Sequence, residues 1–296
     1  MINTKYVIIT PARNEEKLIR YTLESVCSQT IKPSQWIIVD DGSQDNTVTI
    51  VEEYAEKYKW IMIVHTDTFE EKRAGGSKVV RAFNRGYSIL TNEDYDFIVK
   101  LDADLTLPQD YFENVAKCFK ENEHIGLCGG YCINPEESNL KKEKSAEFHV
   151  RGAFKAYRKK CFQEIGGLKP VWLWDGLDQM MAMQKGWEIK VLPLAVIHHR
   201  ETTNEYNRIK HSFRHGKEYY KMGHGLFLGI LKSIFLLPNK PLGIGGITFF
   251  TGFFLSALKR EEKIVEKDLE KYIRKFQYTR FKRLLNKSFI SSRSDN

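Results

Sequence analysis

The chain has 296 residues, of which 42% are hydrophobic and 28% are charged; this balance excludes a disordered protein and allows one large or two small domains. The five cysteines are irregularly spaced and form no CxxC pair, which excludes a zinc ribbon or a redox motif and favours reduced thiols. The net charge of +8 is uneven, because residues 1–199 hold 26 Lys and Arg against 29 Asp and Glu, whereas residues 200–296 hold 20 against 9; the basic excess points to nucleic acid or a membrane surface as partner.

The first half of the chain alternates short β-branched runs with longer helical patterns. The expected strands are 6–10, 36–40, 61–65 and 96–102, and the expected helices are 15–29, 47–58 and 77–90. We expect Asn14 to cap the first helix, and Asp45 or Asn46 to cap the second. Because the strands are apolar on both faces, the pattern predicts an α/β fold whose mostly parallel sheet has helices on both sides.

The pattern is less regular after residue 123. The expected elements are strands over 125–133, near 149–156 and over 188–200, a short helix that ends at Gly166, and a helix over 175–186.

Two apolar runs, 225–237 and 242–258, follow near the C-terminus. Their 13 and 17 residues fall short of the roughly 20 that span a bilayer. From Lys271 to Arg293 there are eight basic residues and no acidic one, interleaved with aromatic residues. This combination predicts a helical region that lies on an anionic membrane surface. The alternative is that both runs pack as ordinary helices against the rest of the protein.

Polar or glycine-rich segments stand where the first four strands end. They are "TPARNEE", "DDGS", "RAGGSK" and "DAD". Ligands of parallel α/β sheets bind beyond the carboxyl ends of the strands, so we expect one crevice built from these loops. The sequence contains no GxxxxGK[ST], GxGxxG or GxSxG pattern, which argues against a P-loop, a dinucleotide fingerprint and a nucleophile elbow.

Asp102 and Asp104 are the strongest metal candidates in this crevice. In an extended segment, residues i and i+2 face the same side, so both carboxylates can point at one ligand. Their mutual repulsion is offset by a divalent cation, and Mg²⁺ is often held by one or two carboxylates together with substrate phosphates.

Other polar residues of the crevice have two readings. Asp40 or Asp41 could hydrogen-bond a base or a ribose, or could belong only to a turn. A neutral histidine after the last strand could ligate the metal, and Arg200 could grip phosphate. Because side chains alternate along a strand, at most one of His198 and His199 should face the site.

Asp175 and Asp178 are the candidates for a general base. They lie at positions i and i+3 of an expected helix, so they share a face, and Trp172 and Trp174 precede them. A carboxylate beside apolar rings has a raised proton affinity and can act as a base. The alternative is an acidic pair that only stabilises the helix N-terminus.

Five segments in chain order resemble the family 2 glycosyltransferases, which have the GT-A fold, a Rossmann-like sheet that binds nucleotide sugars. The segments are "VIITPARNEEKLIRYTLESVCSQT", "WIIVDDGSQDNT", "KLDADLTLP", "RGAFKAYRKKCFQEIGGL" and "WDGLDQMMAMQKGW". The resemblance implies a catalytic domain over 1–200, with a nucleotide-sugar-binding half (1–120) and an acceptor half (121–200). A basic and apolar region, 201–296, follows it.

The resemblance implies a role for each matching position. Asp104 would ligate Mg²⁺ or Mn²⁺, Asp102 would lie toward the ribose and the metal, and a histidine would complete the site. The metal candidates are therefore Asp104, Asp102, His199 and His198. Residues expected around the nucleotide sugar are Pro11, Ala12, Asn14, Glu16, Asp40, Asp41, Arg73, Lys78, Asp102, Ala103 and Arg200. Residues expected on the acceptor side are Arg151, Gly152, Trp172 and Trp174.

The catalytic base follows from the family's spacing. The base is the second residue of an acidic pair, eleven residues before the glycine that ends the helix. Counting back from Gly186 gives Asp175, but the preceding residue is Trp174 and not an acid, so Asp178 stays a competitor.

The family inverts the anomeric centre. The resemblance therefore implies transfer of a sugar from a UDP- or GDP-sugar to a lipid-linked or polysaccharide acceptor during cell-surface glycan synthesis. Asp175 would take the proton of an acceptor hydroxyl, whereas an already ionised lipid phosphate would need no strong base. The tail resembles membrane-associated members, which implies the cytoplasmic face of the cell membrane, no nucleic-acid partner, and an oligomer as an open possibility.

Two other classes of protein fit part of the pattern. A sugar-phosphate nucleotidyltransferase also places paired carboxylates on a metal, but it usually needs a glycine-rich basic loop after the first strand, and "TPARNEE" is not one. A non-catalytic protein that binds a membrane or nucleic acid would explain the basic tail. It would leave the carboxylates at several strand ends without a role.

Overall fold

The computed structural model describes residues 4–66, 76–133, 148–200, 208–238 and 242–294, with side chains as far as residue 283. The chain divides into two compact units, Met1–Glu201 and Thr202–Asn296, and each unit is described by itself. All five cysteines are free.

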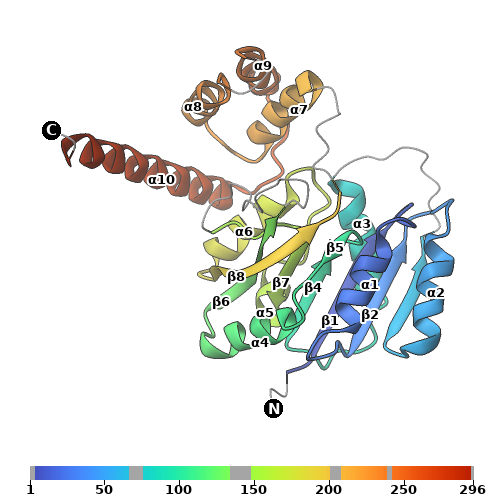
Figure 1. Ribbon diagram of the computed structural model, residues 1–296. Helices are drawn as coiled ribbons and strands as arrows, with labels where there is room; N and C mark the ends of the chain where they lie inside the picture. The colour runs from blue at the N-terminus through green and yellow to red at the C-terminus, as the bar shows by residue number, and fades with distance from the viewer. Residues whose placement is uncertain (1–3, 67–75, 134–147, 201–207, 239–241, 295–296) are drawn as a thin grey trace. The chain divides into compact units, whose positions relative to one another are not determined.

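The first unit is built on an eight-stranded sheet in the order β3-β2-β1-β4-β7-β6-β8-β5 (Figure 1). Its strands are β1 (Tyr6–Ala12), β2 (Gln35–Asp40), β3 (Ile61–His65), β4 (Phe97–Leu101), β5 (Leu105–Thr106), β6 (Ile125–Ile133), β7 (Phe154–Arg158) and β8 (Glu188–His198). The first four strands run parallel, and so do β6 and β8. β7 runs antiparallel to both of its neighbours, and β5 runs antiparallel to β8. The sheet is therefore mixed, and mostly parallel as expected.

Helices cover both faces of this sheet, which confirms the expected fold class. One face carries α1 (Ile19–Cys27), α2 (Thr47–Lys57) and α4 (Tyr111–Glu121); the other carries α3 (Ser77–Ser88), α5 (Lys159–Glu164) and α6 (Trp174–Gln184). β1 shows how the sequence serves both layers, because Tyr6 and Ile8 enter one core while Val7 and Ile9 enter the other. Strand alternation thus fixes the two-sided burial that the apolar runs predict.

The expectation that Asn14 caps the first helix is wrong. The helix begins at Ile19, and Leu18 occupies its cap position. Asn14 has a φ of 53°; its N–H donates to Ser43 Oγ at 3.0 Å, and its Oδ1 accepts from Gln44 N at 2.8 Å. Asparagine tolerates this left-handed backbone better than most residues. It therefore joins the loop after β1 to the loop after β2.

The start of α2 resolves the second capping alternative. Asn46 occupies the cap position without a side-chain cap bond, and its amide donates instead to Glu16 Oε2 at 3.1 Å. Asp45 Oδ1 accepts from Thr47 N at 3.0 Å. Asp45 is therefore the residue whose carboxylate satisfies a main-chain donor at this helix start.

Four helices make up the described part of the second unit. They are α7 (Arg208–Lys221), α8 (Leu226–Leu236), α9 (Ile244–Leu258) and α10 (Lys267–Ser294). α7 and α9 touch backbone to backbone, since a Cβ on Gly216 would lie 1.9 Å from Phe249 O, and one on Gly252 would lie 2.1 Å from Phe213 O. The two apolar runs thus form α8 and α9 of a packed helical unit. Within the described ranges, no helix is both long enough and apolar enough to cross a bilayer.

His224 is a buried histidine in the turn between α7 and α8. Its Nδ1 lies 3.0 Å from Tyr219 O, and since a carbonyl only accepts, Nδ1 carries the proton. The ring stacks on Tyr219 at a centroid distance of 3.5 Å. Burial lowers the pKa of His224 to about 3. The folded unit therefore holds this ring in its neutral form.

Replacing His224 by Asn should make the second unit less sensitive to acid. The asparagine amide can keep a donor toward Tyr219 O but binds no proton. Because the pKa is lower in the folded unit than its ordinary 6.5, the contribution to stability is complete above pH ~6.5 and is lost as the pH falls toward 3. From about pH 7 to about pH 5, wild type should lose roughly 2 kcal/mol that the variant keeps.

Amide hydrogen exchange of α7 and α8 peptides in the full chain, corrected for the intrinsic pH dependence of exchange, measures this loss. Replacing the exposed His211 by Asn is the matched control. An equal loss of protection in wild type and in the His224→Asn variant would contradict the assignment.

Candidate active site

The candidate site lies at the carboxyl ends of β1, β2 and β4. β1 lies between β2 and β4 in the sheet, so the chain adds strands first on one side of β1 and then on the other. Strand order reverses at this point, which is where α/β sheets form a ligand crevice. Pro11 and Ala12 end β1 and pair in register with Val39 and Asp40, so the first two loops of the expected crevice leave the sheet side by side.

The two aspartates after β2 have different surroundings. Asp40 is buried; its Oδ1 accepts from Ser43 N at 3.0 Å, and its Oδ2 lies 3.3 Å from His65 Nδ1. Asp41 is more accessible, and its Oδ1 accepts from the Thr66 hydroxyl at 3.0 Å. Asp40 therefore shapes the turn, and Asp41 is the better placed of the two to contact a nucleotide.

The glutamates after β1 link the loops around the candidate site. Glu16 lies outside the first helix, and its carboxylate accepts from the main chain of Asn46 at 3.1 Å. Glu15 forms an ion pair with Arg200, and the Arg200 Nε lies 3.2 Å from Asp104 Oδ2. Sequence reasoning assigned Glu15 no role in the site, because its partner Arg200 lies 185 residues later in the chain.

Asp104 is the centre of a charged cluster. Its Oδ2 lies 3.3 Å from His198 Nε2, besides its contact with Arg200. Burial by itself would raise the pKa of Asp104, but the His198 hydrogen bond and the nearby positive charges lower it overall. Burial likewise opposes the charged form of His198, yet Asp104 raises its pKa to about 10. Asp104 is therefore ionised in the folded protein.

The other oxygen of Asp104 is the observation that fits a cation. Oδ1 is buried and has no hydrogen-bond partner among the described residues, although a buried carboxylate oxygen normally has one. Carboxylate oxygens suit Mg²⁺ and Mn²⁺, and Mg²⁺ sites usually borrow further ligands from substrate phosphates. In the described part of the chain, no three acidic, histidine or cysteine side chains form a ready-made metal cage. Asp104 and His198 could thus hold a divalent ion only together with a phosphate ligand or water.

The structure separates the two histidines, as strand alternation predicts. His198 faces Asp104, whereas His199 Nε2 lies 2.7 Å from Thr106 Oγ1 and its ring stacks on Tyr21 at 4.0 Å. His198 is therefore the better placed of the two for a metal, and its ring would give up the proton that its raised pKa keeps there in order to coordinate one.

Asp102 is turned toward a lysine. Lys100, which is buried in β4, donates to Asp102 Oδ1, and the Asp102 side chain is 31% exposed. Burial raises the pKa of Asp102, Lys100 lowers it, and Asp104 raises it again. Ala103 is buried between the two aspartates. Asp102 keeps an exposed edge for a ribose or for a shared cation.

Two cations were expected near the loop before α3. Lys78 lies in the first turn of α3, and Arg73 lies outside the described residues. Gly76, just before α3, has a φ of 66°, and a Cβ there would lie 2.7 Å from Trp172 O. This close approach brings the start of α3 against the expected acceptor side.

Asp175 occupies an accessible position in the first turn of α6. Its side chain is 39% exposed, and its Oδ2 lies 3.9 Å from His149 Nε2. A Cβ on Gly152 would lie 2.6 Å from the Trp174 ring and 3.0 Å from Asp175 Cβ, so only glycine fits beneath them. Arg151 and Trp172 are half-buried in the same region of the chain.

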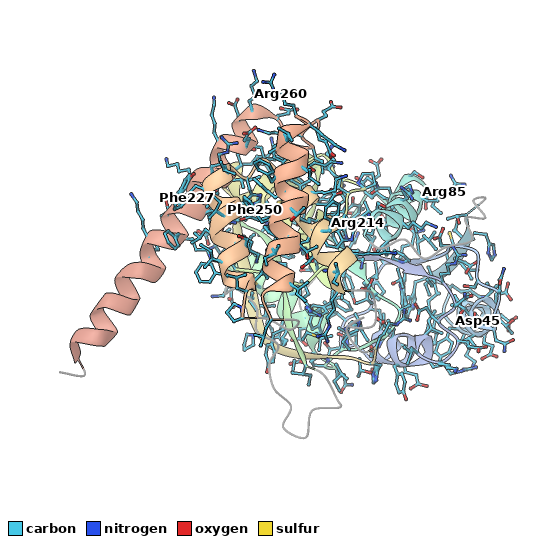
Figure 2. The ribbon with its side chains drawn as sticks, turned by 90° about the horizontal axis from the view of Figure 1, so that it is seen from above. Asp45, Arg85, Arg214, Phe227, Phe250 and Arg260 are labelled. Atoms are coloured by element: carbon cyan, nitrogen blue, oxygen red, sulfur yellow. The ribbon has the colours of Figure 1, made fainter. Side chains whose placement is uncertain are left out.

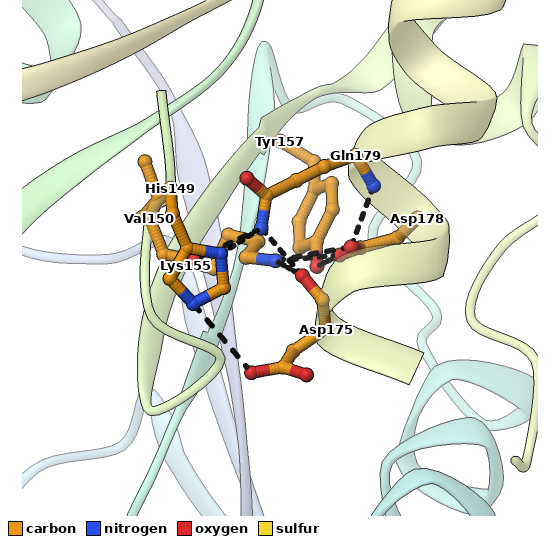
Figure 3. Close-up of polar contacts among 7 residues, drawn as sticks. All are labelled: His149, Val150, Lys155, Tyr157, Asp175, Asp178 and Gln179. Atoms are coloured by element: carbon orange, nitrogen blue, oxygen red, sulfur yellow. Dashed lines mark hydrogen bonds and ion pairs between the residues drawn. The ribbon is translucent and has the colours of Figure 1, made fainter. Parts of the chain in front are cut away.

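Asp178, the competitor for the base, is part of the core (Figure 3). Its side chain is 2% exposed, and its oxygens lie 2.9 and 3.1 Å from the Nζ of the fully buried Lys155. The Tyr157 hydroxyl donates to the same carboxylate. Burial raises the pKa of Asp178, and Lys155 and Tyr157 oppose that shift. Asp178 has no access to a substrate, which leaves Asp175 as the candidate base.

The polar network around Asp175 also contains two residues that the sequence did not single out. Figure 3 shows His149 beside Asp175, with the side chain of Gln179 extending from α6 toward His149. A single histidine and a glutamine within a helix belong to no sequence motif. Their proximity to Asp175 arises only when the segment before β7 packs against α6.

Comparison with known proteins identifies the family. Residues 7–173 match the family described as glycosyl transferase family 2. The chain belongs to this family. The resemblance of the five segments is thereby confirmed, and the fold and enzyme class follow from it.

Two curated relatives show how far the similarity extends. "Glycosyltransferase GlyA" of Streptococcus pneumoniae is 28% identical over 166 residues, which cover 56% of this glycosyltransferase and 21% of the relative. "Poly-beta-1,6-N-acetyl-D-glucosamine synthase" of Staphylococcus aureus is 25% identical over 207 residues, which cover 62% of this chain and 47% of that protein. The chain therefore spans less than half the length of either relative.

Solved structures show the same GT-A fold. S. aureus TarS 1-349 in complex with UDP-GlcNAc aligns with a TM-score of 0.56 at 17% identity, covering 88% of this glycosyltransferase and 74% of TarS 1-349. The mannosyltransferase PcManGT from Pyrobaculum calidifontis in complex with GDP-Man and Mn²⁺ aligns with a TM-score of 0.56 at 18% identity, covering 87% and 76% of the two chains.

Removing one partner of the buried pair beneath α6 should destabilise the first unit. Lys155→Met leaves Asp178 buried without its cation, and we expect a loss of about 3–5 kcal/mol. The double variant Lys155→Met with Asp178→Leu removes both charges and should recover most of that loss. Urea unfolding followed by tryptophan fluorescence measures this unit, because all five tryptophans lie between Trp36 and Trp187.

Lys5→Met is the matched control, since the Lys5–Asp94 pair is largely exposed and exposed pairs contribute about 0–1 kcal/mol. A Lys155→Met loss no larger than this control would show that Asp178 is not held as a buried ion.

Proposed function

We propose that this family 2 member is an inverting glycosyltransferase that uses a UDP- or GDP-sugar and Mg²⁺ or Mn²⁺. It transfers the sugar to a polysaccharide or lipid-linked acceptor during cell-surface glycan synthesis. The observation that carries the proposal is the unpartnered, buried oxygen of Asp104 beside His198 and Arg200. The UDP-GlcNAc and GDP-Man complexes of the similar folds support a nucleotide sugar as donor.

One chain of contacts ties the donor side to the base. Lys100 donates to Asp102, and the Lys100 Nζ lies 5.3 Å from the centre of the Trp174 ring. Trp174 directly precedes Asp175. This chain of contacts supports a single site in which the carboxylates expected to serve the donor and the acceptor lie together.

The geometry supports a direct displacement at the sugar C1. Asp175 takes the proton of the acceptor hydroxyl, the new oxygen–C1 bond forms, and the bond from C1 to the diphosphate oxygen breaks. The leaving diphosphate keeps that electron pair, and Arg200 offsets its charge. Asp104 and His198 would hold the divalent ion, which when bound neutralises further charge on the diphosphate.

Asp175→Asn should reduce sugar transfer at least ~100-fold, the usual effect of losing a general base, while nucleotide diphosphate binding with Mn²⁺ stays within a few-fold. The assay offers UDP- and GDP-sugars to the full chain and measures transfer and donor hydrolysis separately. Asp94→Asn, an exposed aspartate in the same unit, is the control. Full activity of the Asp175→Asn variant would exclude a hydroxyl acceptor that needs this base.

We further propose that the second unit lies on an anionic membrane surface at the cytoplasmic face. The exposed apolar side chains of α8 and α9 support this partner; they are Leu226, Phe227, Ile230, Ile234, Phe235, Ile244, Ile247, Phe254, Leu255 and Leu258. Figure 2 labels Phe227 of α8 and Phe250 of α9 among the side chains of this unit. Nucleic acid would use the positive charge but not this apolar surface, since its binding rests mainly on phosphate contacts.

Replacing Ile234 and Phe235 together by Gln should weaken binding to vesicles of phosphatidylcholine and phosphatidylglycerol at least ~tenfold. Each fully buried apolar side chain of this size contributes about 1.5–3 kcal/mol, and these two are 54% and 60% exposed in the protein. Co-sedimentation of the full chain measures the binding.

Met62→Gln, an exposed apolar residue on β3, is the matched control. Equal binding of all three proteins would show that α8 does not touch the bilayer. A change in oligomeric state of the double variant without a change in vesicle binding would assign the face to another copy of the chain.

A further inference from the structure

The network beside Asp175 fixes the orientation of one buried amide (Figure 3). Gln179 is 1% exposed, and its Nε2 faces two main-chain carbonyls, Val150 O at 3.2 Å and the closer Asp175 O. A carbonyl only accepts hydrogen bonds, so the nitrogen of the amide, and not its oxygen, must lie on this side.

This orientation decides the tautomer of His149. Gln179 Nε2 also lies 2.9 Å from His149 Nδ1. The amide nitrogen can donate but not accept, so a proton on Nδ1 would point at the amide hydrogens, and Nδ1 is therefore the acceptor. The amide has two hydrogens for three acceptors, so one hydrogen is shared between two of them. A neutral imidazole with a bare Nδ1 carries its proton on Nε2, and Nε2 is the atom that faces Asp175 Oδ2 at 3.9 Å.

The surroundings of His149 favour the neutral ring. Burial lowers the pKa of His149, the charges of Lys155 and Arg151 lower it further, and Asp175 opposes them. A protonated ring would also set Nδ1–H against the amide hydrogens of Gln179. The ring is therefore poised to donate from Nε2 without itself bearing charge.

We propose that His149 is a positioning residue for Asp175, with its Nε2–H directed at Oδ2 so that Oδ1 is left to accept the acceptor's proton. This role rests on the proposed function, in which Asp175 is the base. The 3.9 Å separation is longer than a hydrogen bond and needs about 1 Å of approach; such contacts often tighten only when substrate is bound. His149 touches neither the donor nor the reacting atoms in this role, because it acts through the carboxylate.

Asp175 is well placed to be directed in this way. Its main-chain carbonyl is held by Lys155 Nζ at 2.7 Å and by Gln179, so the first turn of α6 is fixed. Among the described ion pairs, the Asp175 carboxylate takes part only in the one with His149. The backbone at Asp175 is therefore held in place, and only the orientation of its carboxylate has still to be fixed by a neighbouring group.

Steady-state kinetics of the full chain tests the proposal with three variants. His149→Ala should lower kcat about tenfold or more, the effect of one hydrogen bond to a charged group, with the donor KM unchanged. His149→Gln, which can place an N–H near the same point, should restore most of the rate. Gln179→Met should also lower kcat, but by a smaller factor than His149→Ala.

Nitrogen-15 NMR of the resting protein gives a readout besides activity. The His149 signals, assigned by their loss in His149→Gln, should show a neutral ring protonated on Nε2, and Gln179→Met should allow the other tautomer. A wild-type ring protonated on Nδ1, or a His149→Gln variant as impaired as His149→Ala, would overturn the proposal. Full activity of Asp175→Asn would instead overturn the proposed function, and the NMR result would still report the tautomer.

Discussion

Two buried lysines lie opposite each other at the centre of the first unit, and the site depends on how their charges are neutralised. Lys100 of β4 and Lys155 of β7 are paired in register, and both are essentially inaccessible. Their like charges would be prohibitive in an apolar core without partners. Lys100 binds Asp102, Lys155 binds Asp178, and the Trp174 ring lies 5.3 and 5.5 Å from the two ammonium groups. One cross-strand pair thereby ties the carboxylate at the end of β4 to the first turn of α6.

This arrangement explains why α6 can present Asp175 reliably. A helix N-terminus often frays, because its first N–H groups and its side chains have few internal partners. Here Lys155 holds both the Asp178 carboxylate and the Asp175 carbonyl. Gly152 lets the Trp174 ring sit directly against the turn that precedes β7. The first turn of α6, which carries the candidate base, is therefore held in place by the contacts of Lys155 and by the packing of Trp174.

The sequence predicts those features that are set by local pattern. Apolar runs with both faces buried predict the strands, and the spacing of Asp102 and Asp104 points to the candidate site before any fold is known. The sequence does not predict that Asp178 is inaccessible. Residues i and i+3 lie on the same face of a helix, but their exposure to solvent can still differ. Lys155, 23 residues earlier in the chain, decides this outcome. Asn14 was misassigned for a related reason, since its partners belong to the loop after β2.

The uneven charge of the chain acquires a physical meaning if the second unit binds the membrane as proposed. Residues 1–199, with more Asp and Glu than Lys and Arg, carry the crevice for an anionic donor, and residues 200–296 carry the basic excess. An anionic bilayer attracts the second segment and not the first, over a range of roughly one Debye length. The charge distribution would thus select which unit contacts lipid. Most of the affinity would come from burial of the apolar side chains of α8 and α9, because electrostatic attraction between solvent-exposed charges is weak.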